Sequence, residues 1–239
     1  MTDLVRLNKF ISENGNYSRR KADELIKRGD ILVNGIKAIL GQKINPNQDK
    51  VAINGKELKQ SKLVYYALNK PKGVITSASD EIGRQTVTDL VPKNPRVFPV
   101  GRLDKESQGL IILTNDGDLA NQLTHPKFEH EKEYQINVKC QITNNKNIEN
   151  TVIKSFTKGL MIDGKLMKMD KCRLAGLNAN RYMLNAILHT GYNRQIRKMC
   201  AKMGLKVLEL TRVRIEKLKL SDLNIETGKY LAIKKEMIL

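Results

Sequence analysis

Asp104 is the candidate catalytic group of this sequence, and it lies among charged neighbours in the segment Gly101-Arg102-Leu103-Asp104-Lys105-Glu106. A carboxylate can act as a base or as a nucleophile. An isolated aspartate between charged residues is, however, more often part of a surface loop or a helix cap. The segment by itself therefore leaves both interpretations open.

Tyr134 and Arg197 are two further side chains whose types suit such a site. An ionised aspartate in a closed pocket needs a cationic partner, which lowers its pKa by about 1 to 3 units. Arg197 lies at the flank of the apolar stripe of a predicted helix, so periodicity fits an exposed residue as well as an active-site partner. A tyrosine that opens an alternating strand is more often a core residue. Residue type alone does not decide either role.

Metal and disulfide chemistry are not indicated by the sequence. The three cysteines lie about thirty residues apart without a Cys-x-x-Cys pair, and the three histidines have no metal-ligand spacing. We find no glycine-rich loop that would cradle a phosphate. We expect structural or surface positions for all six residues, which are Cys140, Cys172, Cys200, His125, His130 and His189.

The charge of the whole chain points to a polyanionic partner. Its 239 residues include 43 Lys and Arg against 25 Asp and Glu, a formal net charge of +18. The apolar stretches are too short to span a bilayer, and residues 1–10 are too charged for a signal peptide. We therefore expect a soluble, cytoplasmic protein.

The first sixty residues predict a small basic unit. Periodicity predicts a helix over residues 4–11 and a second over residues 19–28, capped by Ser18 and ended by Gly29. Asn34-Gly35 and Asn54-Gly55 predict hairpin turns. A solvated helix face would also explain the charge, but neutralisation of RNA phosphates is favoured for the clustered residues Lys9, Arg19, Arg20, Lys21, Lys27 and Arg28. The order of residues over this unit resembles the S4 RNA-binding domain.

A polar stretch ending at Lys62 predicts a domain boundary, so we divide the chain into residues 1–62 and 63–239. The second part alternates strands and helices. Strands are predicted at 110–113, 134–138 and 182–188, and helices at 118–123 and around 148–156. Asn193 is predicted to cap a helix reaching Met203, and Val213 and Ile215 to form the buried side of a strand. The fold class is α+β.

Several segments, taken in order, resemble one enzyme family across essentially the whole chain. These are Leu68-Asn69-Lys70-Pro71-Lys72-Gly73, the Asp104 segment, Leu113-Thr114-Asn115-Asp116-Gly117, Lys132-Glu133-Tyr134 and Gly191-Tyr192-Asn193-Arg194-Gln195-Ile196-Arg197. The set is similar to the RsuA family of ribosomal RNA pseudouridine synthases, whose members commonly carry an N-terminal S4 domain. Within that family it looks most like the branch called pseudouridine synthase F, which acts on large-subunit ribosomal RNA.

The resemblance implies a role for each matching residue. Asp104 would be the catalytic aspartate, Arg197 its cationic partner and Tyr134 the active-site tyrosine that stacks on the flipped uracil. Among the substrate-binding residues, Ile196 would form an apolar wall beneath the base and Arg102 would enter the space that the base vacates, whereas a simple phosphate contact also fits Arg102. The other implied substrate-binding residues are Asn193 and Arg194.

The same resemblance implies a catalytic domain built on a mostly antiparallel mixed sheet and an isomerisation that needs no cofactor. The expected partner is ribosomal RNA of the large subunit or its assembly intermediates, bound by a monomer without membrane contact. A non-catalytic RNA-binding or ribosome-assembly factor is the alternative. It is disfavoured because such a protein has no chemical reason to keep Asp104, Tyr134 and Arg197 together. A binder of anionic membranes or heparin would explain the charge but none of the motifs.

Overall fold

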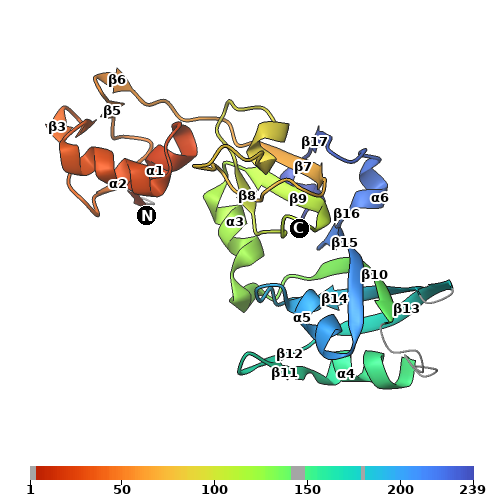
Figure 1. The fold of residues 1–239 in the computed structure, drawn as a ribbon. Coiled ribbons are helices and arrows are strands. Elements are labelled where there is room, and N and C mark those ends of the chain that lie inside the picture. Colours follow the sequence, from red (N-terminus) through yellow and green to blue (C-terminus); the bar gives the residue numbers. More distant parts are fainter. Residues whose placement is uncertain (1–3, 141–148, 179–180) are drawn as a thin grey trace.

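The computed structural model describes residues 4–140, 149–178 and 181–239. It shows an N-terminal unit and a larger C-terminal unit, joined by residues 58–64, which form neither helix nor strand (Figure 1). Among the described residues, no helix is long and apolar enough to cross a membrane. The N-terminal unit consists of β1 (Val5–Arg6), α1 (Leu7–Asn14), α2 (Arg19–Arg28), β2 (Ile31–Val33), β3 (Ile36–Lys37), β4 (Lys43–Ile44), β5 (Val51–Ile53) and β6 (Lys56–Glu57).

Local sequence signals set the ends of helix α2. The side chain of Ser18 accepts a hydrogen bond from the backbone N–H of Lys21, and Gly29 ends the helix with a φ of 80°. Both predicted signals are confirmed. Helix α1 begins at Leu7, three residues later than periodicity predicted from Leu4, because β1 takes up the preceding residues and pairs with β4.

Two hairpins complete the N-terminal unit at the predicted turns. Asn34 and Gly35 join β2 to β3 with φ values of 53° and 81°, and Asn54 and Gly55 join β5 to β6 with 50° and 78°. Both residues of a type I′ turn require such positive φ values. The strands and helices enclose a separate apolar core that includes Leu7, Phe10, Ile11, Ala22, Leu25, Ile31, Ile44 and Val51.

The C-terminal unit is built on a sheet of nine described strands in the order β13-β14-β10-β15-β9-β7-β17, with β8 paired to β9 and β16 to β15. Only the short β9–β15 contact is parallel, which confirms the predicted mostly antiparallel mixed sheet. The strands are β7 (Tyr65–Lys70), β8 (Phe98–Val100), β9 (Gln108–Thr114), β10 (Lys132–Cys140), β13 (Lys171–Asn178), β14 (Arg181–Leu188), β15 (Leu205–Ile215), β16 (Leu218–Lys219) and β17 (Tyr230–Ala232).

Short helices and one hairpin cover this sheet (Figure 1). Phe156 of α4 and Met199 of α5 are fully buried against β10, β14 and β15. Of the helix predicted around 148–156, Ile148 lies outside the described residues, and the rest forms a π-helical turn followed by α4. The covering elements are η1 (Val87–Leu90), α3 (Gly117–Thr124), η2 (Pro126–Phe128), η3 (Glu149–Ile153), α4 (Lys154–Lys158), β11 (Leu160–Ile162), β12 (Lys165–Met167), α5 (Gln195–Lys202), α6 (Leu220–Leu223) and η4 (Lys235–Met237).

The predicted Asn193 cap of helix α5 is wrong. Arg194 occupies the position before the helix in a left-handed conformation, with a φ of 52°, and makes no side-chain cap. Gln195, the first helical residue, instead forms hydrogen bonds with the loop that precedes the helix. Its Oε1 accepts hydrogen bonds from the hydroxyl of Thr190 at 3.0 Å and from the backbone N–H of Tyr192 at 3.2 Å. A buried helical amide therefore replaces the expected cap.

The alternation predicted along β15 is wrong at Val213. A β-bulge shifts the register there, because Glu133 pairs with Arg214 while the next residue, Tyr134, pairs with Arg212. The extra residue reverses the inward and outward sides of the strand. Arg212 is consequently 2% exposed, whereas Val213 is only half-buried.

Candidate active site

A cavity of about 290 Å³ opens where the loop before β9 meets β10, β15 and the start of α5. Loop, strands and helix come from distant parts of the sequence, and the sheet brings them to one place. The predicted catalytic and substrate-binding residues all line this cavity: Arg102, Asp104, Tyr134, Asn193, Arg194, Ile196 and Arg197. Their position is therefore established, and their individual roles stay predictions.

The loop that carries Asp104 is held from beneath by Lys70. This lysine lies at the end of β7 and is completely buried. Its Nζ donates hydrogen bonds to the backbone oxygens of Pro71 at 3.0 Å, Asp104 at 3.3 Å and Ser107 at 2.8 Å. Burial lowers the pKa of Lys70 to about 8. The ammonium thus binds the backbone of the loop and makes no hydrogen bond with the Asp104 carboxylate. Asp104 lines the cavity.

Two guanidinium groups approach the Asp104 carboxylate. Nη1 of Arg194 lies 3.7 Å from Oδ2 of Asp104, and Nε of Arg197 lies 4.0 Å from the same oxygen. Arg197 is fixed through its Nη2, which donates to the backbone oxygen of Glu106 at 3.1 Å and to Oγ of Ser107 at 3.2 Å. Its Nε is buried and has no hydrogen-bond partner among the described residues, so it is available to a closer carboxylate or to substrate. Burial lowers the pKa of Arg197, with a further contribution from Arg194.

Glu106 competes with Asp104 for Arg194. Its Oε2 lies 3.2 Å from Nη1 of Arg194, closer than the Asp104 carboxylate. Hydrogen bonds from its own backbone N–H and from Arg194 lower the pKa of Glu106. Arg194 is therefore shared between two carboxylates at the rim, whereas Arg197, whose side chain is 14% exposed, lies deeper beside Asp104.

Apolar side chains form the opposite wall of the cavity. Tyr134, on β10, packs against two of the cores in the C-terminal unit. Ile196 from α5 lies beside it, and Leu188 and Leu210 from β14 and β15 complete the surface. The cavity therefore has an apolar side and a charged side. Arg102 is exposed at the mouth of the cavity.

Sequence reasoning missed three residues that shape the cavity. Gln195 ties α5 to the chain before it, because its Nε2 also donates to the backbone oxygen of Lys168 at 2.9 Å. Tyr192 lines the cavity with a 39% exposed ring, over which the ammonium of Lys165 lies 5.3 Å from the ring centre. For Lys70 a signal existed, since strand alternation places it on the same side as the buried Leu68. Nothing in the sequence points to the other two contacts, which depend on the loop before α5.

Residues 64–202 match the model of the RNA pseudouridylate synthase family. The chain belongs to this family. Residues 5–49 match the model of the S4 domain. The matched ranges account for the basic N-terminal unit and for most of the sheet that forms the cavity, so the predicted family and fold class are confirmed.

Relatives with assigned names align over most of the chain. It is 40% identical over 222 residues to the dual-specificity RNA pseudouridine synthase RluF of Escherichia coli strain K12, covering 92% of this chain and 72% of that protein. It is 38% identical over 213 residues to the ribosomal large subunit pseudouridine synthase B of Bacillus subtilis, covering 87% and 84%. A crystal structure of a pseudouridylate synthase aligns over 98% of both chains, with a TM-score of 0.65 and 26% identity.

The S4 domain presents most of its predicted RNA-binding residues on helix α2. Arg19, Arg20 and Lys27 are exposed and form no ion pair among the described residues. Lys21 and Arg28 are also exposed, and each pairs with a nearby acidic side chain. Exposed ion pairs of this kind contribute little energy, so both side chains can exchange a carboxylate for a phosphate.

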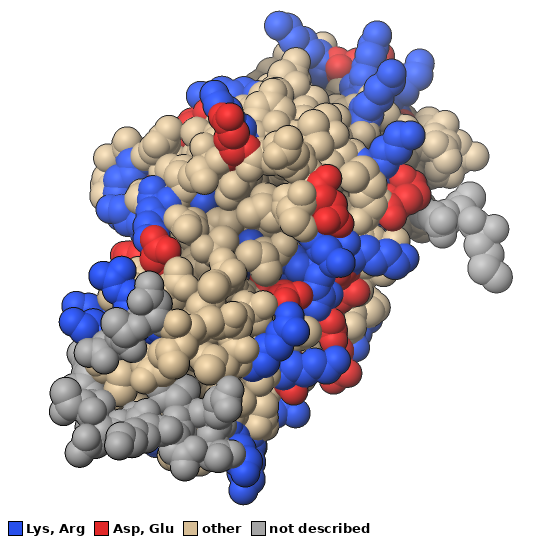
Figure 2. Space-filling view, turned by 90° about the vertical axis from the view of Figure 1, so that its right-hand side faces the viewer, with Lys and Arg blue, Asp and Glu red and all other residues tan. Residues whose placement is uncertain are grey.

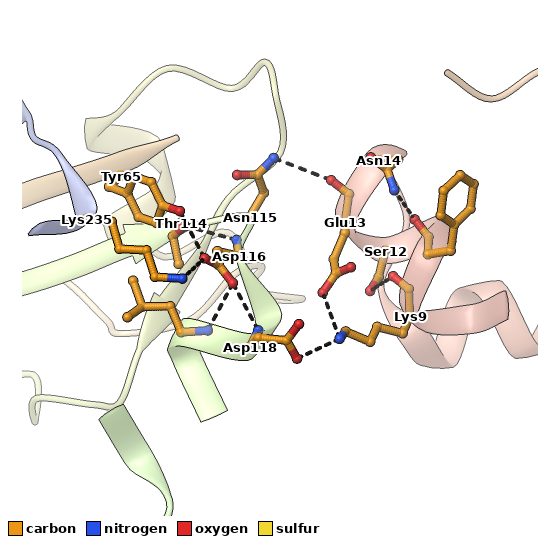
Figure 3. A network of polar contacts seen from close by, with 12 residues as sticks. Lys9, Ser12, Glu13, Asn14, Tyr65, Thr114, Asn115, Asp116, Asp118 and Lys235 are labelled. Carbon is orange, nitrogen blue, oxygen red and sulfur yellow. Dashed lines mark hydrogen bonds and ion pairs between the residues drawn. The ribbon is translucent and has the colours of Figure 1, made fainter. Parts of the chain in front are cut away.

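Lys9 lies elsewhere, at the contact between the S4 domain and the C-terminal unit, which we also call the catalytic unit. Its Nζ is 2.6 Å from Oδ1 of Asp118 and 3.9 Å from Oε1 of Glu13 (Figure 3). The side chain is 24% exposed. The predicted contact of Lys9 with RNA stays a prediction, and the structure shows it in an ion pair between the two units.

Proposed function

We propose that this chain isomerises uridine to pseudouridine in large-subunit ribosomal RNA. The observation that carries the proposal is the cavity, in which Asp104 faces Arg194 and Arg197 across from an apolar wall, in a chain of the pseudouridylate synthase family. The name of the Bacillus subtilis relative supports a substrate in the RNA of the large subunit. The alternative of a non-catalytic RNA-binding factor gives no reason for a carboxylate and two cations to share one cavity.

The reaction needs a group that acts at the sugar. The bond between N1 of uracil and C1′ of ribose breaks, the uracil turns, and a bond forms between C5 and C1′. The hydrogen on C5 then leaves as a proton and N1 gains a proton, so the product is an isomer of uridine. Asp104 serves this sequence either by attacking C1′ or by removing a sugar proton after the bond has broken. Arg197 orients the carboxylate in both routes.

The other cavity residues bind the uridine after it leaves the RNA stack. Extrusion costs a few kcal/mol, and contacts in the pocket offset that cost. Tyr134 and Ile196 supply the apolar surface against which the uracil lies, and the Tyr134 hydroxyl relays a proton. Arg102, exposed at the mouth, enters the vacated position in the RNA, while Asn193 and Arg194 contact the substrate at the rim.

The proposal assigns residues 1–62 to RNA binding and residues 63–239 to catalysis. This boundary lies within the stretch that joins the two units and before β7. The protein acts as a monomer in the cytoplasm on ribosomal RNA or on ribosomal particles that are still assembling. The net charge of +18 supports a polyanionic substrate of this kind.

The test is to map pseudouridine in unmodified large-subunit ribosomal RNA after incubation with the purified protein. Carbodiimide-treated pseudouridine stops reverse transcriptase, so each modified position appears as a new stop. We expect at least one stop with the wild-type protein and none with Asp104→Asn, which keeps the shape of the side chain and removes its charge. A wild-type protein that produces no stop on free RNA or on assembling ribosomal particles would support the non-catalytic alternative.

A further inference from the structure

A second cavity, of about 560 Å³, lies between the S4 domain and the catalytic unit. Its S4 wall is formed by α1 and the start of α2, and its catalytic wall by the segment that leads into β8 and by the start of α3. Polar and charged side chains predominate on both walls, which include Ser12, Ser18, Arg19, Arg96, Phe98 and Asn121. We call this space the interdomain groove.

Polar contacts between the two units hold the walls of the groove together (Figure 3). Besides the Lys9–Asp118 ion pair, Nδ2 of Asn115 donates to the backbone oxygen of Glu13 at 3.4 Å. Gly117 permits the close approach, because a Cβ at this position would lie 2.5 Å from Oε1 of Glu13. The groove is therefore a formed feature of the structure without RNA.

The charges that line the groove are unequally paired. Its acidic members, Glu13 and Asp118, share the ammonium of Lys9. Arg19 is exposed and Arg96 is half-buried, and neither guanidinium makes a hydrogen bond or ion pair with any described residue. Burial lowers the pKa of Arg96, but a guanidinium stays protonated in proteins. A cation that has lost part of its water without gaining an anion is unfavourable, so an anionic ligand in the groove would be stabilising.

We propose that Arg96 and Arg19 together bind one backbone phosphate of the RNA substrate in the interdomain groove. A guanidinium can donate two parallel hydrogen bonds to a phosphate, whereas an ammonium acts as a point charge. A phosphate is therefore a suitable ligand for this pair of arginines. The inference rests on the proposed function, since it takes RNA as the substrate. It adds a contact that belongs to neither domain alone and that fixes how the RNA passes from one to the other.

The chain limits how far this phosphate can lie from the active site. Asp104 follows Arg96 by eight positions, and an extended chain of that length spans at most about 28 Å. An A-form RNA stem of about ten base pairs covers this upper limit. We therefore expect an RNA stem-loop to reach both sites, and a short oligonucleotide around the target uridine to reach the active site alone.

The test compares the affinity of two RNAs for Arg96→Gln, Arg19→Gln and the double variant, measured by fluorescence anisotropy over a range of salt concentrations. One RNA is a stem-loop that carries the mapped uridine, and the other contains only that uridine and its immediate neighbours. Arg84→Gln is the matched control, because Arg84 is an exposed arginine of the same unit already paired with Asp80 at 2.6 Å.

We expect Arg96→Gln to weaken stem-loop binding about 10-fold and to reduce the salt slope by about 0.7 to 0.9. The loss should be absent for the short RNA and for Arg84→Gln. The double variant should lose less than the sum of the single losses, because both arginines hold one phosphate. Equal losses on both RNAs, or wild-type stem-loop affinity for Arg96→Gln, would overturn the proposal.

Circular dichroism and the thermal midpoint report whether Arg96→Gln folds. Arg19 is exposed, so Arg19→Gln tests the same phosphate contact without a risk to folding. Unchanged stem-loop affinity for this variant also overturns the proposal. Failure of the proposed function has a different signature, since it appears as absence of pseudouridine with the wild-type protein, whatever the affinities of the variants.

Discussion

At the scale of single residues, the site is a cluster of charges with a positive balance. The carboxylates of Asp104 and Glu106 face the guanidiniums of Arg194 and Arg197, and the Lys70 ammonium lies directly beneath. A positive surplus attracts the phosphates that flank a flipped nucleotide. The Asp104 carboxylate thus lies among cations that also favour a polyanion.

Lys70 gives a prediction about pH. Its pKa of about 8 in the folded protein lies below the ordinary 10.5, so between these values the unfolded chain holds a proton that the folded protein has lost. Stability contributed by this residue therefore rises with pH across that window, by about 1.4 kcal/mol per unit and about 3 kcal/mol in total. Urea unfolding of the wild type and of Lys70→Met at several pH values measures the difference.

Groups other than Lys70 titrate alike in both proteins and cancel in this comparison. The wild type should gain stability relative to Lys70→Met from about pH 8 to 10.5, with a constant difference below pH 8. A difference that stays flat or shrinks across the window would show that the Lys70 ammonium is not destabilised by burial.

At the scale of elements, the site depends on strand β9 lying against β15. Gly109 pairs with Arg212 in the short parallel contact between these strands and has a φ of 104°. A Cβ at this position would lie 2.3 Å from the backbone oxygen of Arg212, an approach that only glycine allows. The contact joins the strand after the Asp104 loop to the strand beside Tyr134, so both sides of the cavity rely on it.

We predict that Gly109→Ala destabilises the protein by more than about 3 kcal/mol, since backbone strain of about 1 to 2 kcal/mol is added to a clash with backbone that cannot move aside. Gly83→Ala is the control, because Gly83 has a φ of 76° and nothing near its missing Cβ. Gly83→Ala should reduce the free energy of unfolding only by the backbone strain of about 1 to 2 kcal/mol. Denaturant unfolding of both variants checks this, and equal losses would mean that the strand contact adapts to a side chain.

How far the sequence predicts an element depends on whether its signals are local. The cap and stop of α2 are the residues that directly flank the helix, and both predictions are confirmed. The start of α5 was mispredicted because Gln195 forms hydrogen bonds with the preceding loop and with Lys168. Hydrophobic periodicity carries no information about such contacts. The burial of Arg212 was likewise missed, since a bulge against β10 sets it.

The candidate site shows the same limit. The ordered motifs named seven residues that the fold brings to one cavity, although they lie up to 95 positions apart, from Arg102 to Arg197. The motifs did not indicate that Arg194 is shared with Glu106 or that Lys70 supports the loop. Those contacts arise from the geometry of loops, and sequence spacing carries no information about them.

At the scale of the whole molecule, polar contacts hold the two units in a defined arrangement. The Lys9–Asp118 ion pair and the Asn115 contact join the S4 domain to the start of α3 (Figure 3). Basic side chains also lie on the face of the molecule away from the S4 domain, where acidic ones are interleaved with them (Figure 2).

Helix α2 gives a prediction at this scale. Replacing Arg19, Arg20 and Lys21 by Gln should weaken RNA binding and reduce the slope of log affinity against log salt by about 0.7 to 0.9 for each phosphate that the helix no longer binds. Lys154→Gln with Lys158→Gln is the control, because α4 lies at the opposite end of the molecule from the S4 domain (Figure 1). An unchanged slope in the triple variant would mean that this face of α2 is merely solvated.

The most direct test of the central claim is release of tritium from ribosomal RNA labelled at C5 of uridine. Formation of the bond from C5 to the sugar expels the hydrogen at C5, so tritium enters water once per turnover. We predict release by the wild-type protein, a loss of at least about 10²- to 10⁴-fold in Asp104→Asn, and RNA affinity close to wild type in that variant. Release at the wild-type rate by Asp104→Asn would contradict the assignment of Asp104 as the catalytic residue.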